Sequence, residues 1–388
     1  MKKLFYIGLA GLSLFEIGNV FFIMPMPGSQ EINSIDLAYF LYSWRWIFRV
    51  LFTIMVVVGF DAAFRTKRKW LPVTALLLTS TIIGLFNFQM SADKMFLQSQ
   101  NVVMKTKDEN QIPSDRLVIG VENNGEAKAY PIAALAYHHQ VRDNIGGKQV
   151  MVTYCSVCRT GRVYEPVVNG NIETFRLVGM DHFNAMFEDE HTGSWWRQSN
   201  GESVAGELKG MRLKELSFKQ LTVSKWFDLY PNGSVMQPDQ TFLSEYDSLG
   251  KFEKGKSKSS LTGTDSSSWN PKSWVVGIEL GNSSKAYDWN DLKNEKIIND
   301  VIGNTPIFLV LSTDGQSFAA FERPVNSLFT VSNDILYSDG QIYNFAGVGL
   351  PPSSGQLKQI NAYQEFWHSW STFHPGTQKY IPIARKIN

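Results

Sequence analysis

Cysteine is scarce in this chain, whose 388 residues include only two, Cys155 and Cys158. A network of several disulfides is therefore excluded, as is a zinc ribbon, which needs a second Cys-x-x-Cys pair. The residue that follows Cys158 is Arg159 and not histidine, which excludes attachment of a c-type haem. Any cysteine chemistry must therefore come from this single Cys-x-x-Cys pair.

An excess of charge of one sign is also lacking, because 37 Lys and Arg residues stand against 36 Asp and Glu residues. Without a basic stripe or an RNA-binding motif, we expect no nucleic-acid partner. The chain lacks a Walker loop, a dinucleotide fingerprint, a zinc-protease helix and a nucleophile elbow. The motifs therefore assign no enzymatic class, and they leave the oligomeric state open.

Most of the long apolar stretches lie at the start of the chain, at residues 4–24, 46–64 and 71–90. Each is about as long as a helix that crosses ~30 Å of hydrocarbon. The first stretch also fits a signal peptide, but Glu16 and the lack of a small-x-small cleavage site favour a retained helix. We therefore predict three transmembrane helices within residues 1–91, with the lipid bilayer as a partner.

Basic residues indicate how these helices are oriented. Lys2 and Lys3 precede the first stretch, and the basic run 65–69 lies between the second and the third. By the positive-inside rule both segments are cytoplasmic, so the third helix places the rest of the chain outside the cell (inner) membrane. Arg45 and Arg49, near the outer end of the second stretch, disagree with this orientation. We expect Glu16, Arg49 and Asp61 within the stretches to pair, to snorkel or to face the other helices.

The chain after the apolar stretches contains two similar segments. Residues 117–122 resemble residues 274–279, and further matches follow at the same offset, with Asp143 and Asp300 among them (300 − 143 = 157). Later matches have an offset of 149. Chance would give single matches of this kind but not an ordered series, so we predict an internal duplication.

The apolar stretches and the internal matches together predict a layout of five segments. They are an anchor (1–91), a juxtamembrane linker (92–112), a first copy with the cysteines (113–240), a polar connector (241–273) and a second copy without them (274–388). Within each copy, short β-branched or aromatic runs alternate with turn residues, and Asn169-Gly170 predicts a hairpin. The expected fold class is therefore α+β and β-rich, with N-terminal transmembrane helices followed by an internally duplicated extracytoplasmic domain.

The copies differ where chemistry would occur. At an offset of 157, the positions of the two cysteines hold Ser312 and Gly315, and the position of His139 holds Lys296. The later drop in offset gives the first copy about eight additional residues (157 − 149 = 8). We place them at Met180 to Phe187, for which we find no counterpart in residues 329–337. The predicted site therefore belongs to the first copy alone.

An ordered set of motifs extends over roughly residues 115–375. It comprises Tyr130-Pro131, the runs 139–143, 146–147, 152–158 and 193–198, and Gly161, Gly201, Gly206, Trp226 and Pro231. In these residues the sequence resembles a bacterial family catalogued as domain of unknown function 3179 (DUF3179). The family usually has a small residue where this chain has Arg159, and it favours Tyr or Arg before the Asn in His182-Phe183-Asn184. The resemblance implies no settled activity.

We favour a metal site for the cysteines. Residues 154–161 have the strand–turn–strand pattern of a metal knuckle, in which two thiolates converge on one ion. Two thiolates with imidazole and thioether donors suit copper, whereas two Cys with two His suit zinc. We therefore predict a membrane-anchored, redox-type copper protein, with zinc as the alternative ion. The predicted ligands are Cys155, Cys158, His139, His182 and Met186.

Two other functions remain open. One is a thiol–disulfide oxidoreductase acting on partner proteins, in which Arg159 and Arg162 would lower a thiol pKa. The other is a non-catalytic binding domain with a structural disulfide, although a bond that closes so short a loop restrains little unfolded-chain entropy. The metal site and the thiol–disulfide oxidoreductase both imply a protein partner, which would be a redox protein or a metal donor.

Overall fold

The computed structural model describes residues 1–351 and 355–382, and the chain divides into two compact units. Residues 352–354 and 383–388, which belong to the predicted second copy, lie outside the described residues. The helical unit comprises Met1–Leu97, Glu173–Arg197 and Glu202–Arg212, and the β-rich unit comprises Gln98–Ile172, Gln198–Gly201 and the chain from Leu213 onward.

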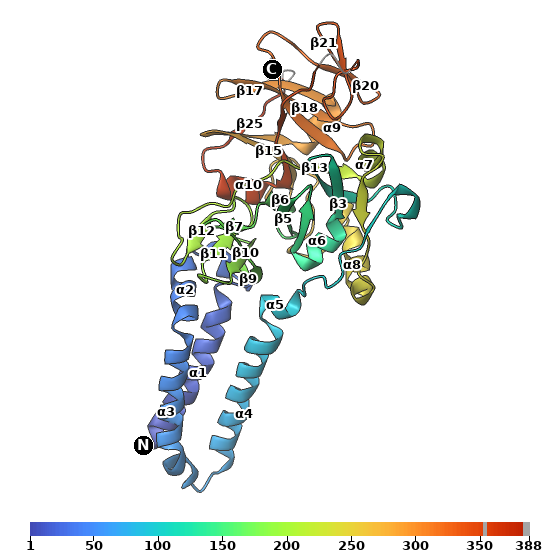
Figure 1. The fold of residues 1–388 in the computed structure, drawn as a ribbon. Helices are drawn as coiled ribbons and strands as arrows, with labels where there is room; N and C mark the ends of the chain where they lie inside the picture. Colours follow the sequence, from blue (N-terminus) through green and yellow to red (C-terminus); the bar gives the residue numbers. More distant parts are fainter. Residues whose placement is uncertain (352–354, 383–388) are drawn as a thin grey trace. The chain divides into compact units, whose positions relative to one another are not determined.

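Three long apolar helices dominate the helical unit (Figure 1). They are α1 (Lys2–Phe21), α3 (Arg45–Phe64) and α4 (Trp70–Gly84), which η2 (Leu85–Gln89) continues. Each of the three segments is 20 residues long and apolar enough to cross a membrane, which confirms the predicted helices and indicates membrane association. Short helices lie between and after them: η1 (Ser29–Glu31), α2 (Ile35–Ser43) and α5 (Ala92–Met95).

Three charges within the apolar helices, those of Glu16, Arg49 and Asp61, are paired. Arg49 Nε lies 2.7 Å from Glu16 Oε1, and Arg49 Nη2 also donates to Asn87 Oδ1 at 2.7 Å. Asn87 Nδ2 in turn donates to Glu16 Oε2 at 2.9 Å. Near the other end of α3, Arg65 and Asp61 form an ion pair at 2.6 Å. This confirms that these charges pair, as is required of charges in an apolar medium.

The helical unit also contains a four-stranded sheet from a distant part of the chain. Its order is β12-β11-β10-β9. The chain between α1 and α2 holds this sheet, because Met180 N donates to Ile23 O at 2.7 Å and Phe183 N donates to Gln30 Oε1 at 3.1 Å. The strands are β9 (Phe175–Asp181), β10 (Asn184–Asp189), β11 (Trp195–Arg197) and β12 (Ser203–Ala205).

In the β-rich unit the same order of elements occurs twice. The first half contains β2 (Leu117–Asn123), β3 (Glu126–Pro131), α6 (Ile132–His138), β4 (Gln140–Ile145), β5 (Lys148–Cys155), β6 (Thr160–Tyr164), β13 (Lys219–Thr222), α7 (Val223–Leu229) and β14 (Ser234–Met236). The second half contains β15 (Trp274–Leu280), β16 (Ser283–Asp288), α9 (Trp289–Glu295), β17 (Ile297–Ile302), β18 (Thr305–Leu311), β19 (Phe318–Glu322), β24 (Tyr363–Phe366), α10 (Trp367–Phe373) and β25 (Gln378–Lys379).

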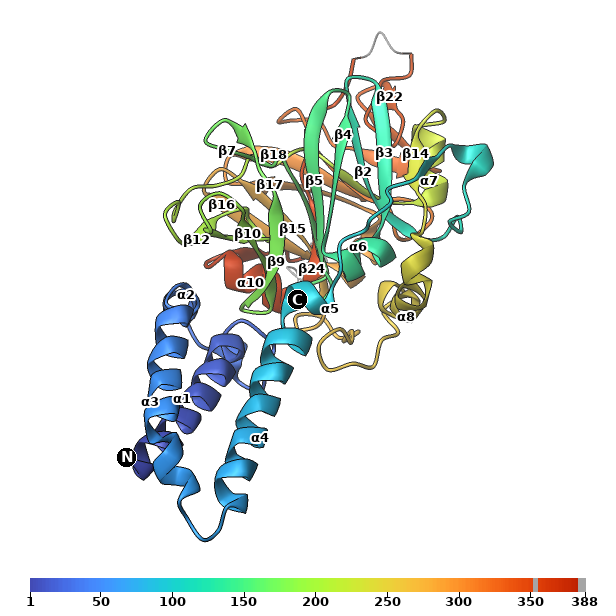
Figure 2. The same ribbon diagram turned by 60° about the horizontal axis from the view of Figure 1, so that its bottom comes forward.

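The strand order is also the same in both halves. One sheet runs β1-β14-β3-β2-β13, and the other, β24-β15-β16-β25, has the same order read in reverse, with β1 as an additional edge strand of the first. β14 pairs in parallel with β3, and β25 with β16. Figure 2 labels β2, β3 and β14 of the first sheet and β15, β16 and β24 of the second. The hairpins β4-β5-β6 and β17-β18-β19 form separate sheets, the latter extended by β23. The fold is therefore α+β and rich in strands, as predicted. The remaining elements are β1 (Met104–Lys105), η3 (Lys107–Glu109), β7 (Val167–Val168), β8 (Asn171–Ile172), η4 (Gln240–Phe242), α8 (Leu243–Glu253), β20 (Thr330–Ser332), β21 (Ile335–Ser338), β22 (Gln341–Tyr343) and β23 (Gln359–Ile360).

Matched residues make matched contacts in the two halves. Tyr130 Oη donates to Asp143 Oδ2 at 2.7 Å, and Tyr287 Oη donates to Asp300 Oδ2 at 3.0 Å. A glycine on an inner strand, β2 or β15, makes room for a tryptophan in each half. A Cβ on Gly120 would lie 2.3 Å from Trp226 Cζ3, and one on Gly277 would lie 2.1 Å from Trp370 Cε3. Any larger residue at either glycine would displace the indole.

The hairpin around residue 182 also has a counterpart, contrary to the sequence-based expectation. The turn between β9 and β10 has positive φ at His182 and Phe183 (49° and 66°), and the turn between β20 and β21 has the same pattern at Asn333 and Asp334 (49° and 62°). The greater length of the first half falls mostly before this turn. There β7 and β8 form the hairpin that Asn169-Gly170 predicted.

Candidate dithiol site

The two cysteines lie in a tight hairpin turn. Cys155 ends β5 and pairs with Thr160 at the start of β6, so Cys158 lies within the turn itself. Arg159 adopts a left-handed conformation with φ of 58°. Glycine adopts this conformation most easily, which explains why a small residue suits this place. The strand–turn–strand pattern expected around the cysteines is confirmed.

Both cysteines are thiols and are fully buried. The thiol of Cys158 is hydrogen-bonded to Cys155 and to the hydroxyl of Ser369. Burial raises the pKa of the Cys158 thiol well above its usual value, and the neighbouring Cys155 adds to this shift while Ser369 opposes it. Cys158 is therefore protonated at neutral pH, within a fully buried dithiol.

Two basic side chains from distant segments meet the turn at one carbonyl group. Lys272 Nζ donates to Val157 O at 3.0 Å, and His368 Nε2 lies 3.3 Å from the same oxygen. Burial lowers the pKa of Lys272, whereas its interactions with both cysteines raise it. Burial, aided by the charge of Lys272, lowers the pKa of His368 to about 4. A cation and a neutral imidazole thus lie beside the dithiol.

A buried carboxylate connects the dithiol to its surroundings. Glu365 Oε1 accepts hydrogen bonds from Arg162 Nη2 at 2.7 Å and from Thr160 Oγ1 at 3.1 Å. Glu365 Oε2 accepts a hydrogen bond from Ser369 Oγ at 2.7 Å, and Ser369 in turn contacts the Cys158 thiol. This network fixes the hydroxyl that faces the sulfur, and the carboxylate charge is balanced by the arginine.

Residues of α8 and of the second half surround the turn. Phe366 N donates to Cys158 O at 2.9 Å. The guanidinium of Arg159 donates to the carbonyls of Phe252 and Glu253 at 3.1 and 2.9 Å, and it stacks 3.7 Å above the ring of Trp274. The turn is therefore held from three directions, by α8, by Trp274 and by Phe366.

His139 has a structural task at the end of α6. It takes a left-handed conformation with φ of 62°, its N–H donates to Leu135 O at 2.7 Å, and its carbonyl accepts from Tyr154 N at 3.0 Å. Lys296 has the same φ and makes the equivalent two bonds in the second half. Burial lowers the pKa of His139 to about 4, so its imidazole is neutral.

The other predicted ligands, His182 and Met186, lie in the helical unit. His182 Nδ1 is 2.5 Å from Asp181 Oδ1, and Asp181 also pairs with Arg197 at 2.6 Å. Met186 is fully buried on β10. The predicted ligand set is thus divided between the two units, and it stays a prediction.

Within residues 1–351 and 355–382, no group of three or more His, Cys, Asp or Glu side chains is placed to hold a metal ion. The residues that do surround the dithiol are Lys272, Glu365, His368 and Ser369, which sequence reasoning missed. Lys272 lies in a Ser/Lys-rich segment that reads as a solvated connector, and the other three lie in the half without cysteines. No local pattern points to them.

Comparison with known proteins identifies a family but no activity. The family model described as Protein of unknown function (DUF3179) matches residues 98–377, which is more than half of the chain. No curated protein and no solved structure matches the chain.

Proposed function

Because the chain belongs to the DUF3179 family, which is described as having unknown function, we propose a role from the site itself: Cys155 and Cys158 form one two-sulfur centre that binds a Cu(I) ion. The observation that carries this proposal is the pairing of two buried, hydrogen-bonded thiols with the cation of Lys272. Cu(I) is a soft ion that thiolates select, and two thiolates suffice to hold it.

The number of available ligands favours copper over zinc. Structural zinc is almost always held by four ligands, and catalytic zinc by three protein ligands and a water molecule. The described residues bring no group of that size together around the cysteines. A two-coordinate ion needs neither His139 nor the residues of the helical unit. The proposal therefore keeps the predicted metal and reduces the ligand set to the sulfurs.

Lys272 makes such a centre electrostatically acceptable. When Cu(I) replaces the two thiol protons, the ion and two thiolates together carry one negative charge, and two protons are released. A buried negative charge is costly unless an opposite charge lies close by. The ammonium group of Lys272, which interacts with both cysteines, supplies that charge.

We further propose that this site lies outside the cytoplasm, in the cell (inner) membrane, with the N-terminus inside. Lys2, Lys3 and the basic run 65–69 support this orientation. Thiolate-bound Cu(I) suits a compartment in which free thiols tend to oxidise, because burial shields the sulfurs. A metal-donor protein is then the partner that the site requires.

An internal duplication accounts for a site in one half only. It is supported by the repeated strand order and by the equivalent Tyr–Asp and Gly–Trp contacts. We propose that both halves derive from one unit, and that the half with Ser312 and Gly315 supplies the wall of the site instead of a second one. The residues of that half that contact the turn are Glu365, Phe366, His368 and Ser369.

The hydrogen bond between the thiols favours a second candidate, a reversible disulfide. In that reaction the two thiols lose two protons and two electrons, and a sulfur–sulfur bond forms. A disulfide of a partner protein would accept both electrons and protons and become two thiols. The raised pKa and the burial of Cys158 oppose this chemistry, since the exposed thiolate is the reactive form.

Anaerobic titration of the full chain with Cu(I), in detergent and against a Cu(I)-binding dye, tests the proposal. We expect one ion per chain in the wild type and in the matched control Ser156→Ala, and loss of binding in Cys155→Ser and Cys158→Ser. If the wild type binds no copper but forms a disulfide that a mild reductant opens, the second candidate replaces the first. If neither occurs, both fail.

A further inference from the structure

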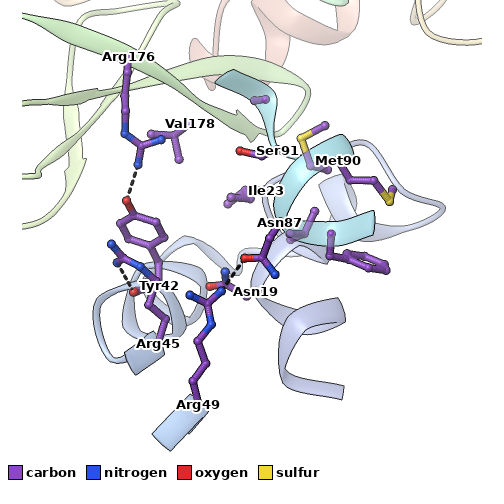
Figure 3. A pocket seen from close by; sticks show the side chains of 14 residues that line it. Asn19, Ile23, Tyr42, Arg45, Arg49, Asn87, Met90, Ser91, Arg176 and Val178 are labelled. Carbon is purple, nitrogen blue, oxygen red and sulfur yellow. Dashed lines mark hydrogen bonds between the residues drawn. The ribbon is translucent and has the colours of Figure 1, made fainter. Parts of the chain in front are cut away.

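A polar cavity of about 120 Å³ lies within the helical unit, where the ends of the apolar helices meet β9 (Figure 3). Sites for drug-sized ligands have volumes of roughly 300–1,000 Å³, so this cavity suits a single small group. Its wall comes from four segments: the end of α1 with the residues after it, the α2–α3 junction, η2 with the residues after it, and β9.

The wall carries positive charge. Arg45, Arg49 and Arg176 line the cavity, and none of the lining residues is Asp or Glu. Arg49 is paired with Glu16, and Arg176 with Glu188 at 2.8 Å. Arg45 differs from these two arginines in its hydrogen-bonding partners.

Arg45 donates one hydrogen bond to Tyr42 O at 2.6 Å and lies over the ring of Tyr42. In the part of the chain that the structure describes, it has no carboxylate within ion-pair distance. Its guanidinium therefore keeps most of its donors for a ligand, and guanidinium groups bind phosphate through paired hydrogen bonds.

Asn19 gives a second and independent indication of a ligand. Its side chain lines the cavity, is 9% exposed, and has an Oδ1 atom without a hydrogen-bond partner among the described residues. A buried polar atom that lacks a partner is costly, so such atoms usually mark a bound water or ligand. The partner that this oxygen requires is a hydrogen-bond donor.

The cavity lies at one end of the membrane-crossing helices. Asn19 is near the end of α1, Arg45 begins α3, and Asn87 is near the end of η2. At the same end Trp44 and Trp46 are 50% and 65% exposed, as is typical of aromatic residues at a membrane–water boundary. Phospholipid headgroups occupy that boundary, and basic pockets between helices bind them.

We propose that this cavity binds a phosphate group, and that the headgroup of a membrane phospholipid supplies it. Arg45 pairs with the phosphate oxygens, and Asn19 Oδ1 accepts a hydrogen bond from a hydroxyl or ammonium group of the same headgroup. The site is independent of the dithiol. A lipid bound in this cavity contacts both the apolar helices and β9.

Native mass spectrometry and thermal unfolding of the full chain in detergent test this proposal. The probes are phosphatidylglycerol, phosphatidylethanolamine, diacylglycerol and inorganic phosphate. We expect the two phospholipids to bind and raise the Tm, and diacylglycerol, which has no phosphate, to do neither. Arg45→Gln should weaken binding about tenfold, the loss expected for a hydrogen bond to a charged group. Arg45→Lys should retain most of it.

Arg65→Gln is the matched control, because Arg65 lies near the other end of α3, is exposed and pairs with Asp61. Its lipid binding should equal that of the wild type. Equal lipid binding by Arg45→Gln overturns the proposal, provided that this variant unfolds at the wild-type Tm without lipid. Protection by inorganic phosphate that matches the phospholipids overturns the lipid as the source of the phosphate. Asn19→Leu is a second variant that fills the cavity and should also reduce binding.

Discussion

The ammonium nitrogen of Lys272 lies 3.0 Å from the carbonyl oxygen of Val157, one of the two residues between the cysteines. A lysine of the polar connector therefore forms part of the dithiol site, although 115 residues separate it from Val157. Its charge interacts with both cysteines. The connector is thus a component of the site.

Removing the charge of Lys272 should weaken Cu(I) binding. Lys272→Gln leaves the negative charge of the copper–thiolate group without its neighbouring cation, and we expect the affinity to fall about tenfold or more, a change of about 1.4 kcal/mol. Lys272→Arg keeps the charge and should bind nearly as well as the wild type. Lys258→Gln, an exposed lysine of the same connector, is the control. Equal affinities in Lys272→Gln and the wild type would refute the electrostatic role.

The thiols should resist alkylation while the protein is folded. The nucleophile is the thiolate, and burial raises the pKa of Cys158, so the thiol is protonated at neutral pH. We expect iodoacetamide to label neither cysteine in the native copper-free chain, and to label both in denaturant, as read by mass spectrometry. Rapid labelling of the native protein would contradict this description of the site.

The same shift predicts a pH dependence at alkaline pH. A thiol whose pKa is raised in the folded state stabilises the fold fully below its unfolded pKa of about 8.5, and this stability is lost as the pH rises further. Thermal unfolding of the copper-free chain should therefore occur at lower temperature above that pH. Cys158→Ser, which has no group that titrates there, should show a smaller decrease.

Replacing His139 should separate its backbone role from its titration. Asparagine tolerates the left-handed conformation, so His139→Asn should be more stable than His139→Ala by about 1 kcal/mol. The folded pKa of His139 is lowered to about 4, so its contribution is present above its unfolded pKa of about 6.5 and is lost as the pH falls towards 4. His139→Asn should lose stability less steeply over that range, as measured by urea unfolding. A slope equal to that of the wild type would show that His139 does not titrate as described.

The Glu16–Arg49 pair should be coupled energetically. Glu16→Gln leaves the guanidinium of Arg49 without its counter-charge inside the helical unit, and breaking a buried pair in this way costs about 3–5 kcal/mol. The double variant Glu16→Gln/Arg49→Gln carries neither charge and should be more stable than the single one. Thermal unfolding in detergent measures both. Independent, additive losses would show that the pair is not coupled.

The sequence predicts those features of the fold that depend on local patterns. Length and hydropathy are enough for α1, α3 and α4, because the bilayer sets both. Asn169-Gly170 is enough for the β7–β8 hairpin, since both residues accept positive φ.

The position of residues 173–197 could not be predicted in the same way. Trp195 and Trp196 indicate that this segment is buried, but not that it packs with the apolar helices. Burial patterns identify an inward face without identifying its partner.

The surroundings of the cysteines were beyond sequence reasoning for the same reason. His368 and Val157 are 211 residues apart, and Thr160 and Glu365 are 205 apart. Contacts between residues so far apart in the chain produce no periodic pattern in the sequence. Histidine and methionine residues near the cysteines in sequence were the natural candidates, yet His139 caps a helix and His182 pairs with Asp181. The residues that reach the turn are a lysine, a serine, a glutamate and a histidine that lies 211 positions from Val157 in the sequence.

X-ray absorption spectroscopy at the copper edge, on the full chain loaded with Cu(I) in detergent, tests the central claim most directly. Two sulfur scatterers with no imidazole nitrogen, lost in Cys155→Ser and retained in His139→Asn, are the result that the two-thiolate centre predicts. Imidazole scattering in the wild type that disappears in His139→Asn or His182→Asn would contradict it, as would copper without sulfur ligands.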